Sequence, residues 1–499
     1  MAAPHLYKLL LYTQRIHFHL SQTMKNLSPS FSPFLVLILT VSFIKIASAT
    51  CHVDDEAGLL GFKSGITQDP SGMLSTWKPG TDCCSWAGIN CLFDDRVTTI
   101  SLYGQLDQPN SFLSGTISPS LSKVQDLNGI YFQDLRNISG PFPDILFRLP
   151  KLTYVYIENN KLSGQIPVSI GRLTQLEALS LAGNRFTGQI PSSISKLTRL
   201  TQLNVGKNLL NGKFPEGIKQ LRNLTYLNLE QNKLSGTIPD IFKSFPDLRI
   251  LTLTRNAFSG KIPESVSSLA PRLMYLELGH NALRANCFLG NFRALDTLDL
   301  TWNSFTGVVP KTFANLTKIF NLDLSHNSLN DPFPQMNVKG IESLDLSYNN
   351  FHLKQIPKWV TSSPIIYSLK LAKCGITMKL DNWKPAETYF YDFIDLSENE
   401  ISGSPVALLN RTDFLVEFKA AGNKLKFDLG KLRIVETLKE LDISRNLVYG
   451  KVPMAVVGLK RLNVSYNHLC GQLPKTQFPV SSVVGNDCLC GSPLPPCKL

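Results

Sequence analysis

Four consecutive segments of the chain share one nine-residue pattern: LEALSLAGN (residues 176–184), LTQLNVGKN (200–208), LTYLNLEQN (224–232) and LRILTLTRN (248–256). Aliphatic residues occupy the first, fourth and sixth positions, and asparagine occupies the ninth. About 15 or 16 such units predict a repeat architecture, although length alone would suggest about three domains. The marker asparagine recurs along most of the chain, at Asn160, Asn184, Asn208, Asn232, Asn256, Asn281, Asn303, Asn327, Asn349, Asn399, Asn423, Asn446 and Asn467.

Each segment predicts one short β-strand. Its two central aliphatic side chains point to one face and their neighbours to the other, which is the period of a strand. One repeat cannot bury its own aliphatic residues, so successive strands are expected to stack in parallel about 4.8 Å apart. The amide of the marker asparagine can bond backbone groups that the following turn leaves unpaired. Cys374 stands once at this position.

A second marker, Gly-x-Ile-Pro or a close variant, follows the asparagine at residues 164–167, 188–191, 212–215, 236–239, 260–263 and 450–453. Glycine permits the turn, the apolar residue fills the core, and proline fixes φ. The complete unit resembles the plant-type extracellular leucine-rich repeat. The resemblance implies an α/β leucine-rich-repeat solenoid with a parallel β-sheet on its concave face. It also implies a short second sheet and 3-10 or helical turns on the convex side, with disulfide-stapled caps. Residues 351–436 depart from the pattern.

Eight of the ten cysteines form two clusters, one near each end of the repeats: Cys51, Cys83, Cys84 and Cys91, and then Cys470, Cys488, Cys490 and Cys497. Even clusters in an exported chain indicate disulfides. The Cys-Cys and Cys-x-Cys spacings do not match zinc sites, so we predict no metal. Cys287 and Cys374 lie between the clusters, about four repeats or roughly 19 Å of stacking apart, and are predicted to be free thiols.

The two clusters lie in segments that resemble known caps. Residues 55–63, 74–77 and 82–91 resemble the amino-terminal cap of plant leucine-rich-repeat proteins, and residues 486–497 resemble the carboxy-terminal cap of polygalacturonase-inhibiting proteins. The resemblance implies the pairs Cys51–Cys83, Cys84–Cys91, Cys470–Cys488 and Cys490–Cys497. We therefore predict caps at 50–96 and 470–499 around repeats at 97–469. Polygalacturonase inhibitors have fewer repeats than this chain, and receptor-like proteins with the same repeat carry a membrane helix.

The amino terminus predicts export. Residues 34–44 are apolar and are followed by Ala47-Ser48-Ala49, a small-x-small cleavage site, so residues 1–49 are predicted to be a signal peptide. Met24 would give an n-region of more usual length than Met1 and could be the true start. The alternative, a retained signal anchor, needs a longer uninterrupted run. No other stretch is long and apolar enough to span a membrane, so the sequence predicts a released product.

Charge and motifs exclude several functions. The formal net charge is +12, but the basic residues are scattered and form no run of the kind that follows a phosphate backbone, so no nucleic-acid partner is expected. The sequence contains no catalytic motif that we recognise, and we predict neither an enzyme nor a cofactor. Aspartates recur at Asp299, Asp323, Asp345, Asp395 and Asp442, but they share one position in the repeat, which predicts a ladder on the concave face rather than paired catalytic carboxylates.

The concave face carries the candidate binding residues. Aromatic and histidine residues precede the asparagine in four successive repeats, and an acidic column runs beside them. Aromatic residues among polar groups are typical interface anchors, although this repeat position can also simply be exposed and variable. Tyrosines near the amino end form a second candidate. The predicted ligand-binding residues are His280, Trp302, His326 and Tyr348; Glu277, Asp299, Asp323 and Asp345; and Tyr131, Tyr154 and Tyr156.

Five sequons fit an exported glycoprotein: Asn137, Asn223, Asn315, Asn410 and Asn463. Asn463 lies between two core residues, so a glycan there would cover the last repeats of the concave face. Together these features predict a secreted recognition protein of the plant cell wall or apoplast, acting in defence or wall-associated signalling. Its partner would be a protein, a peptide or a wall polysaccharide such as pectin. The alternatives are an inhibitor of a pathogen polygalacturonase or similar enzyme and, much less favoured, a hydrolase. The sequence leaves the ligand and the oligomeric state open.

Overall fold

The computed structural model describes residues 51–92, 95–286, 292–338, 340–385, 388 and 390–497. The predicted signal peptide, the predicted mature start at Thr50 and the predicted free thiol Cys287 lie outside these residues. Every element named below belongs to the compact unit formed by residues 49–499.

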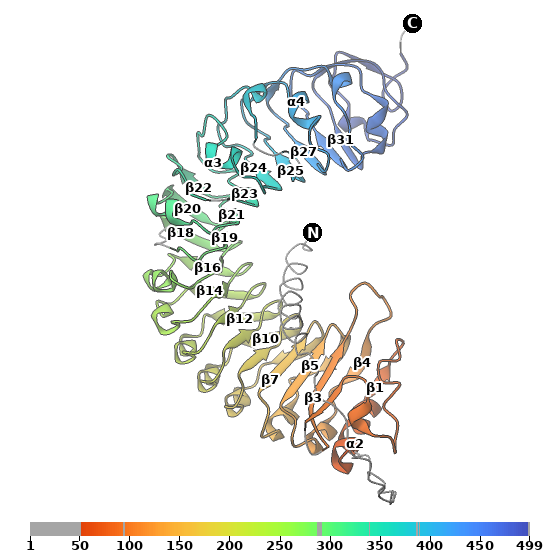
Figure 1. Ribbon diagram of the computed structural model, residues 1–499, viewed down its shortest axis with the longest axis vertical. Coiled ribbons are helices and arrows are strands. Elements are labelled where there is room, and N and C mark those ends of the chain that lie inside the picture. Colours follow the sequence, from red (N-terminus) through yellow and green to blue (C-terminus); the bar gives the residue numbers. More distant parts are fainter. Residues whose placement is uncertain are drawn as a thin grey trace, which may run out of the picture. The chain divides into compact units, whose positions relative to one another are not determined.

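One long parallel sheet lines the inner side of the arc formed by this unit (Figure 1). Its strands pair in register from repeat to repeat, so that Leu203, Leu227 and Leu251 are direct neighbours on adjacent strands. β2 (Ile89–Leu92) joins its first strand antiparallel. The parallel strands are β3 (Arg96–Tyr103), β5 (Gly129–Gln133), β7 (Tyr154–Glu158), β9 (Ala178–Ser180), β11 (Gln202–Asn204), β13 (Tyr226–Asn228), β15 (Ile250–Thr252), β17 (Tyr275–Glu277), β19 (Thr297–Asp299), β21 (Asn321–Asp323), β23 (Ser343–Asp345), β24 (Ser368–Lys370), β25 (Phe393–Asp395), β27 (Glu417–Lys419), β29 (Glu440–Asp442) and β31 (Arg461–Asn463).

The core is a continuous stack of the aliphatic side chains that define the repeat. Leu203, Leu227 and Leu251 are fully buried, as is Phe258 from a neighbouring segment. Each is covered by the same positions in the repeats on both sides, so no single repeat could hold this core alone. The predicted solenoid with its concave parallel sheet is confirmed.

The marker asparagines form a second ladder, inside the turns. The Nδ2 of Asn208 donates to the carbonyl oxygens of Leu181, Val205 and Gly206 at 3.0, 3.2 and 3.0 Å, and its Oδ1 accepts from the amide of Phe186 at 3.0 Å. These bonds satisfy backbone groups that the turn would otherwise bury without partners.

Cys374 occupies the asparagine position in one repeat. Its thiol lies 3.4 Å from the carbonyl oxygen of Leu346 and 3.6 Å from that of Ala372, so a weaker donor takes the same place. Cys374 is free and buried.

A shorter second sheet runs beside the first. Its strands are β1 (Ile66–Gln68), β4 (Leu113–Thr116), β6 (Arg136–Gly140), β8 (Lys161–Gln165), β10 (Arg185–Gln189), β12 (Leu209–Lys213), β14 (Lys233–Thr237), β16 (Ala257–Gly260), β18 (Ala282–Asn286), β20 (Ser304–Val308) and β22 (Ser328–Asn330). Beyond β22 it gives way to isolated bridges and to the pair β26 (Ser402–Gly403) and β28 (Lys424–Leu425). This interruption coincides with the irregular segment 351–436, whereas the concave sheet continues through it.

Tight turns connect the two sheets. They are η2 (Pro119–Lys123), η3 (Asp144–Arg148), η4 (Val168–Arg172), η5 (Ser192–Lys196), η6 (Glu216–Gln220), η7 (Phe242–Ser244), η8 (Glu264–Leu269), η9 (Lys311–Asn315), η10 (Leu380–Asn382), η11 (Leu429–Lys431), η12 (Met454–Gly458) and η13 (Val480–Ser482), with short helices α3 (Lys358–Thr361) and α4 (Val406–Leu409). Many follow the proline of the Gly-x-Ile-Pro marker, which supplies the residue before the turn, as Pro191 does for η5.

Caps close both ends. At the amino end, α2 (Val53–Ser64) and η1 (Cys83–Ser85) cover the first repeats, and Cys51–Cys83 and Cys84–Cys91 are bonded. At the carboxyl end, β30 (Tyr449–Gly450), β32 (His468–Gln472) and β33 (Cys488–Cys490) form a small sheet, with disulfides Cys470–Cys488 and Cys490–Cys497. These are the pairs that the family resemblance implies.

One buried ion pair joins the amino-terminal cap to the sheet. Asp55 of α2 is fully buried, and its carboxylate accepts two hydrogen bonds from the guanidinium of Arg96 at 2.8 and 2.9 Å and one from the amide of Val97 at 2.9 Å. Sequence analysis did not single out Asp55, because only the fold places the cap helix against the start of β3.

Candidate binding face

Four ring side chains from successive repeats stack on one another, and we call them the aromatic stack: His280, Trp302, His326 and Tyr348. Their ring centroids are 5.8, 3.9 and 4.6 Å apart in chain order, and neighbouring planes differ by 12°, 14° and 16°. Trp302 is 52% exposed and Tyr348 41%. The sequence placed these residues in one column, and the structure brings them into direct contact.

The aromatic stack lies in the turns that follow the strands, not on the strands themselves. All four residues have positive φ, between 50° and 56°, a left-handed conformation that is uncommon for residues other than glycine. The expectation that they project from strand positions of the concave sheet is therefore refined: they form a rim along the carboxyl ends of β17, β19, β21 and β23.

Cations occupy the same turn position on both sides of the aromatic stack. Arg255 precedes it by one repeat with φ of 56°, and Lys373 follows it with φ of 52°. Sequence analysis missed both residues, although each stands directly before a marker asparagine or its cysteine replacement. Reading that position through every repeat would have found them.

Beside the rim, three aspartates form a carboxylate ladder: Asp299, Asp323 and Asp345. They are direct neighbours on β19, β21 and β23, and Glu277 of β17 precedes them in the same register. Each aspartate Oδ1 accepts from the backbone amide two residues later, on Thr301, Ser325 and Ser347, at 2.9, 2.9 and 3.0 Å. Each carboxylate therefore accepts a hydrogen bond from a backbone amide just after its strand, and this structural role explains why aspartate recurs there.

Burial makes the carboxylate ladder hard to ionise. It raises the pKa of Asp345 to about 7, with a further increase from Asp323 and a decrease from Lys370. Burial also raises the pKa of Asp323, although hydrogen bonds from Ser325 lower it. The pKa of Asp299 lies well above its ordinary range, because of burial and then the neighbouring Asp323. Ionising several neighbouring carboxylates in a poorly solvated site costs free energy, because burial and like-charge repulsion both disfavour the charged form.

The two histidines of the aromatic stack shift in the opposite direction. Burial lowers the pKa of His280, and the positive charge of Arg255 lowers it further. Burial also lowers the pKa of His326, while Asp323 raises it. Both shifts favour the neutral imidazole.

The amino-terminal tyrosines form a separate cluster. The rings of Tyr131 and Tyr156 stack with centroids 5.1 Å apart. The hydroxyl of Tyr156 donates to Gln202 at 2.6 Å, and that of Tyr154 donates to Glu177 at 2.9 Å. They lie on β5 and β7, several repeats before β17, so the structure does not bring the two predicted groups together.

The predicted glycosylation sites differ in setting. Asn223 is exposed, Asn315 ends the turn η9, Asn410 follows α4, and Asn137 lies on the second sheet in β6. Asn463 lies on the concave sheet in β31, where its Nδ2 donates to Asp442 at 3.2 Å and its Oδ1 accepts from the Ser465 hydroxyl at 2.8 Å.

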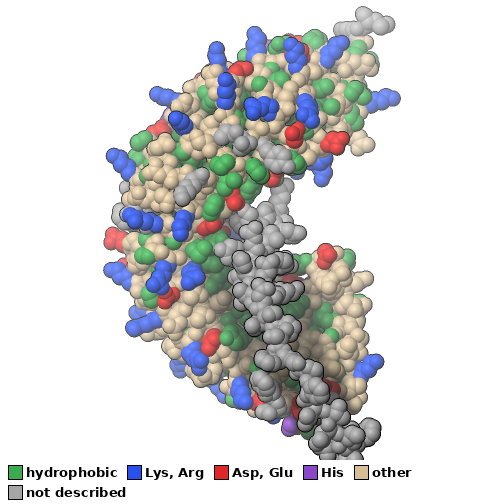
Figure 2. All heavy atoms as spheres, viewed as in Figure 1, with side chains coloured by type: hydrophobic (Ala, Val, Ile, Leu, Met, Phe, Trp, Pro, Cys, Tyr) green, Lys and Arg blue, Asp and Glu red, His purple; other side chains and the backbone are tan. Residues whose placement is uncertain are grey.

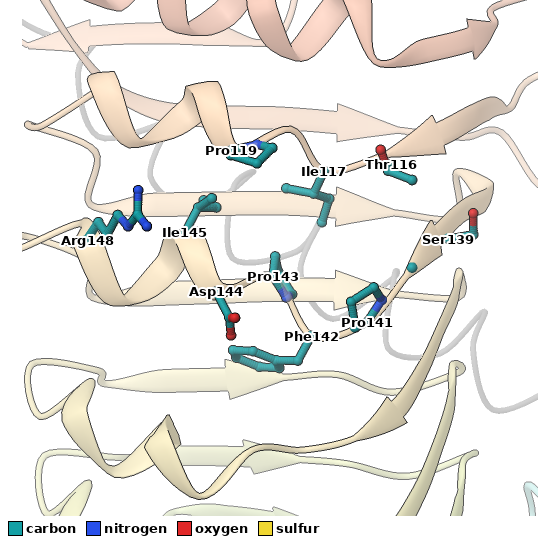
Figure 3. Close-up of a pocket in the computed structure, with 11 residues that line it drawn as sticks. Thr116, Ile117, Pro119, Ser139, Pro141, Phe142, Pro143, Asp144, Ile145 and Arg148 are labelled. Atoms are coloured by element: carbon teal, nitrogen blue, oxygen red, sulfur yellow. The ribbon is translucent and has the colours of Figure 1, made fainter.

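A pocket of about 230 Å³ lies elsewhere, between η2 and η3 (Figure 3). Apolar side chains such as Ile117, Phe142 and Ile145 form most of its lining, with Asp144 and Arg148 at its polar side. It shares no residue with the aromatic stack. The one cysteine and acid grouping compact enough for a metal in the described part of the chain, Cys51, Cys83 and Cys84, is already tied up in disulfides.

No helix among the described residues combines the length and apolar character needed to cross a bilayer.

Known families match much of the chain. Residues 52–92 match the leucine rich repeat N-terminal domain, and residues 111–254 match the leucine-rich repeat region. Further leucine rich repeat matches cover residues 247–269 and 271–329.

Two similar proteins are plant polygalacturonase inhibitors. Polygalacturonase inhibitor 2 of Arabidopsis thaliana is 39% identical over 113 residues, 21% of this chain and 34% of that protein. Polygalacturonase inhibitor 1 of Phaseolus vulgaris is 39% identical over 114 residues, 21% of this chain and 33% of that protein. The matched region thus spans about a third of the length of these relatives.

Solved structures show the same fold. The crystal structure of PEPR1-AtPEP1 superposes with a TM-score of 0.61 at 24% identity, covering 86% of this chain and 67% of that one. A TDR receptor structure superposes with a TM-score of 0.57 at 24% identity, covering 76% and 72%. The chain contains a leucine-rich-repeat N-terminal domain and leucine-rich repeats, is similar in sequence to plant polygalacturonase inhibitors, and shares its fold with the PEPR1-AtPEP1 and TDR receptor structures.

Proposed function

We propose that this protein is an extracellular recognition protein of the plant cell wall or apoplast, and that it binds a protein or peptide on the concave side of the repeats around the aromatic stack. The observation that carries the proposal is the exposure of Trp302, at 52%, in a row of four stacked rings. Exposed aromatic side chains held in a fixed orientation lose little entropy on binding and are frequent hot spots.

The stacking favours a polypeptide over a wall polysaccharide such as pectin. The ring faces of Trp302 and His326 cover each other, so the exposed part of this pair presents ring edges rather than open faces. A sugar ring that stacks on an aromatic residue needs an open face, whereas carbonyl groups and side chains of a polypeptide can meet ring edges. Polysaccharide binding is the alternative outcome of the test below.

The role proposed here is binding rather than catalysis. Asp299, Asp323 and Asp345 each serve as the acceptor that closes a strand end, which accounts for their recurrence without a chemical step. Secretion is supported by the signal-like segment at residues 1–49, by the four disulfides and by the sequons. Glycosylation at the five sequons and a role in defence or wall-associated signalling are parts of the proposal.

The test is affinity capture from a plant cell-wall extract with residues 50–499 as bait. Trp302→Gly removes the ring at a position where the left-handed backbone suits glycine. Tyr466→Gly is the matched control, because Tyr466 has φ of 55° at the same repeat position, is 59% exposed and lies outside the stack. A specific partner should be lost with Trp302→Gly and retained with Tyr466→Gly. Equal capture by all three proteins would overturn the proposed site.

A second candidate function is inhibition of a wall-degrading enzyme, and the likeness to polygalacturonase inhibitors favours it. The purified protein would then slow a fungal polygalacturonase, and Trp302→Gly would relieve the inhibition. Unchanged polygalacturonase activity at micromolar protein would remove this candidate for the enzyme tested.

A further inference from the structure

We propose that the partner presents a short basic segment, of about four to five extended residues, to the surface formed by the aromatic stack, the carboxylate ladder and Glu277. This inference rests on the proposed function and assigns the chemistry of the partner. We call this surface the acidic strip.

Four consecutive strands contribute a carboxylate to the acidic strip: Glu277, Asp299, Asp323 and Asp345. At about 4.8 Å per strand, the four side chains extend over about 15 Å, the length of four to five extended residues. These four acids stand together in a protein whose formal net charge is +12. In Figure 2, Lys and Arg side chains project mainly from the outer side of the repeats, whereas apolar and acidic side chains lie together along part of the inner edge.

Cations mark both ends of the acidic strip. Arg255 occupies the rim before His280, and Lys373 occupies the rim after Tyr348. Lys370 takes the register position after Asp345, with its Nζ 3.8 Å from Asp345 Oδ2. The next aspartate of the column, Asp395, lies between Lys370 and Lys419 and so falls outside the strip. The charge pattern therefore limits the length of the segment that fits.

The aromatic stack suits the same kind of partner. Lysine and arginine carry long apolar stems that pack on aromatic surfaces while their charged ends reach an acid. The turn uses the Oδ1 atom of each aspartate, so a guanidinium or ammonium group of the partner would meet Oδ2 of Asp299 and Asp323 and would compete with Lys370 for Oδ2 of Asp345. Charge complementarity favours a basic polypeptide over an acidic peptide or a polyuronate.

The acidic strip has a distinct pH dependence. Its three aspartates resist ionisation, and the titratable groups that act on them are Glu277, Arg255, Lys370, His280 and His326. As pH rises from 5 to 8, Asp345, whose pKa is raised to about 7, loses its proton, and the histidines, whose pKa values are lowered, lose any remaining positive charge. Both changes make the surface more negative, so affinity for a basic segment should rise with pH. A polyanion would show the opposite trend.

The experiment measures fluorescence anisotropy with fluorescein-labelled hexa-arginine and hexaglutamate at pH 5 and pH 8 in physiological salt. The test variant is Asp323→Asn/Asp345→Asn. Asparagine keeps the Oδ1 acceptor, as Asn228 and Asn463 show at the equivalent register position by accepting from the amides of Glu230 and Ser465. The matched control is Asp395→Asn/Asp442→Asn, because these aspartates close strand ends in the same way outside the strip.

We expect hexa-arginine to bind the native protein about tenfold more tightly at pH 8 than at pH 5, and hexaglutamate to bind at neither. The test variant should lose about tenfold in affinity at pH 8, and the control should stay within about twofold. Tighter binding of hexaglutamate, or of an oligogalacturonide added as a third probe, would overturn the inference. So would a reversed pH trend, equal losses in both variants, or no binding of hexa-arginine at either pH.

The two proposals fail in different ways. If Trp302→Gly abolishes capture of a partner but hexa-arginine does not respond to the aspartates, the binding face stands and its basic ligand is wrong. If the aspartates control hexa-arginine binding but capture from extract is unaffected by Trp302→Gly, the acidic strip stands and the proposed site of the natural partner is wrong.

Discussion

The indole of Trp302 lies against the imidazole of His326, with ring centroids 3.9 Å apart and planes 14° from parallel, although the two residues are 24 positions apart in the chain. Each ring belongs to the same position of its own repeat, and the parallel register of β19 and β21 sets their spacing. The contact therefore depends on the solenoid and not on any local element.

Trp302 should contribute little to stability. Trp302→Ala removes a stacking contact at an exposed position and should lower the free energy of unfolding by about 1 kcal/mol or less. Trp302→Gly should be no less stable than the alanine variant, because glycine adopts positive φ without strain. Urea unfolding followed by circular dichroism measures both. A loss of more than about 3 kcal/mol, the size of a core truncation, would place the ring inside the core.

Asp55 should be the most sensitive charged residue of the amino-terminal cap. Asp55→Ala leaves Arg96 and the amide of Val97 without their buried acceptor, and we expect a loss of about 3 kcal/mol in the stability of the first repeats. Hydrogen exchange at β3 and β5 reports this locally, since a solenoid can open from one end. The control is Asp126→Ala, whose more exposed carboxylate pairs with Lys151 and lies 3.8 Å from Arg96 without a hydrogen bond to it, and which should contribute less than about 1 kcal/mol. Similar losses in both variants would contradict the prediction.

Stability should fall as pH rises from about 5 to 8. The aspartates of the carboxylate ladder have raised pKa values in the folded state, about 7 for Asp345, so the folded protein binds protons that the unfolded chain releases near pH 4. Their stabilising contribution is present below pH 4 and is lost as pH passes the folded pKa. Urea midpoints of the native protein and of Asp345→Asn at pH 5 and pH 8 test this. The variant should show the smaller decrease, and an equal decrease would count against the ladder as its source.

The asparagine ladder should be essential in each repeat. Asn208→Ala leaves the amide of Phe186 and the carbonyl oxygen of Leu181 without partners inside the turn, which should cost about 3 kcal/mol. Asn211→Ala, on the exposed side of β12, should change stability by less than about 0.5 kcal/mol. Thermal unfolding of the two variants compares them directly. If Asn208→Ala is as mild as Asn211→Ala, the amide is not what holds the turn.

The sequence alone determined the repeat, and through it most of the fold. The fixed spacing of Leu and Asn lets every aliphatic side chain be buried by its neighbours, so the parallel concave sheet could be predicted before any coordinates. The second sheet and the disulfide-closed caps were expected from the resemblance to plant-type leucine-rich repeats. The same spacing placed His280, Trp302, His326 and Tyr348 in one column, because residues at one repeat position must line up along the solenoid.

Tertiary structure alone decided what those columns become. Turn geometry decides whether the stacked rings touch and which cations lie at the ends of the strip. Packing across several repeats decides how far the carboxylates of Asp299, Asp323 and Asp345 are buried. Ring contact and burial both depend on residues of neighbouring repeats, which are about 24 positions apart in the chain. The left-handed turns that lift Trp302 from the sheet to its rim, and the burial of Asp55 beneath the cap, likewise follow from packing that no single repeat contains.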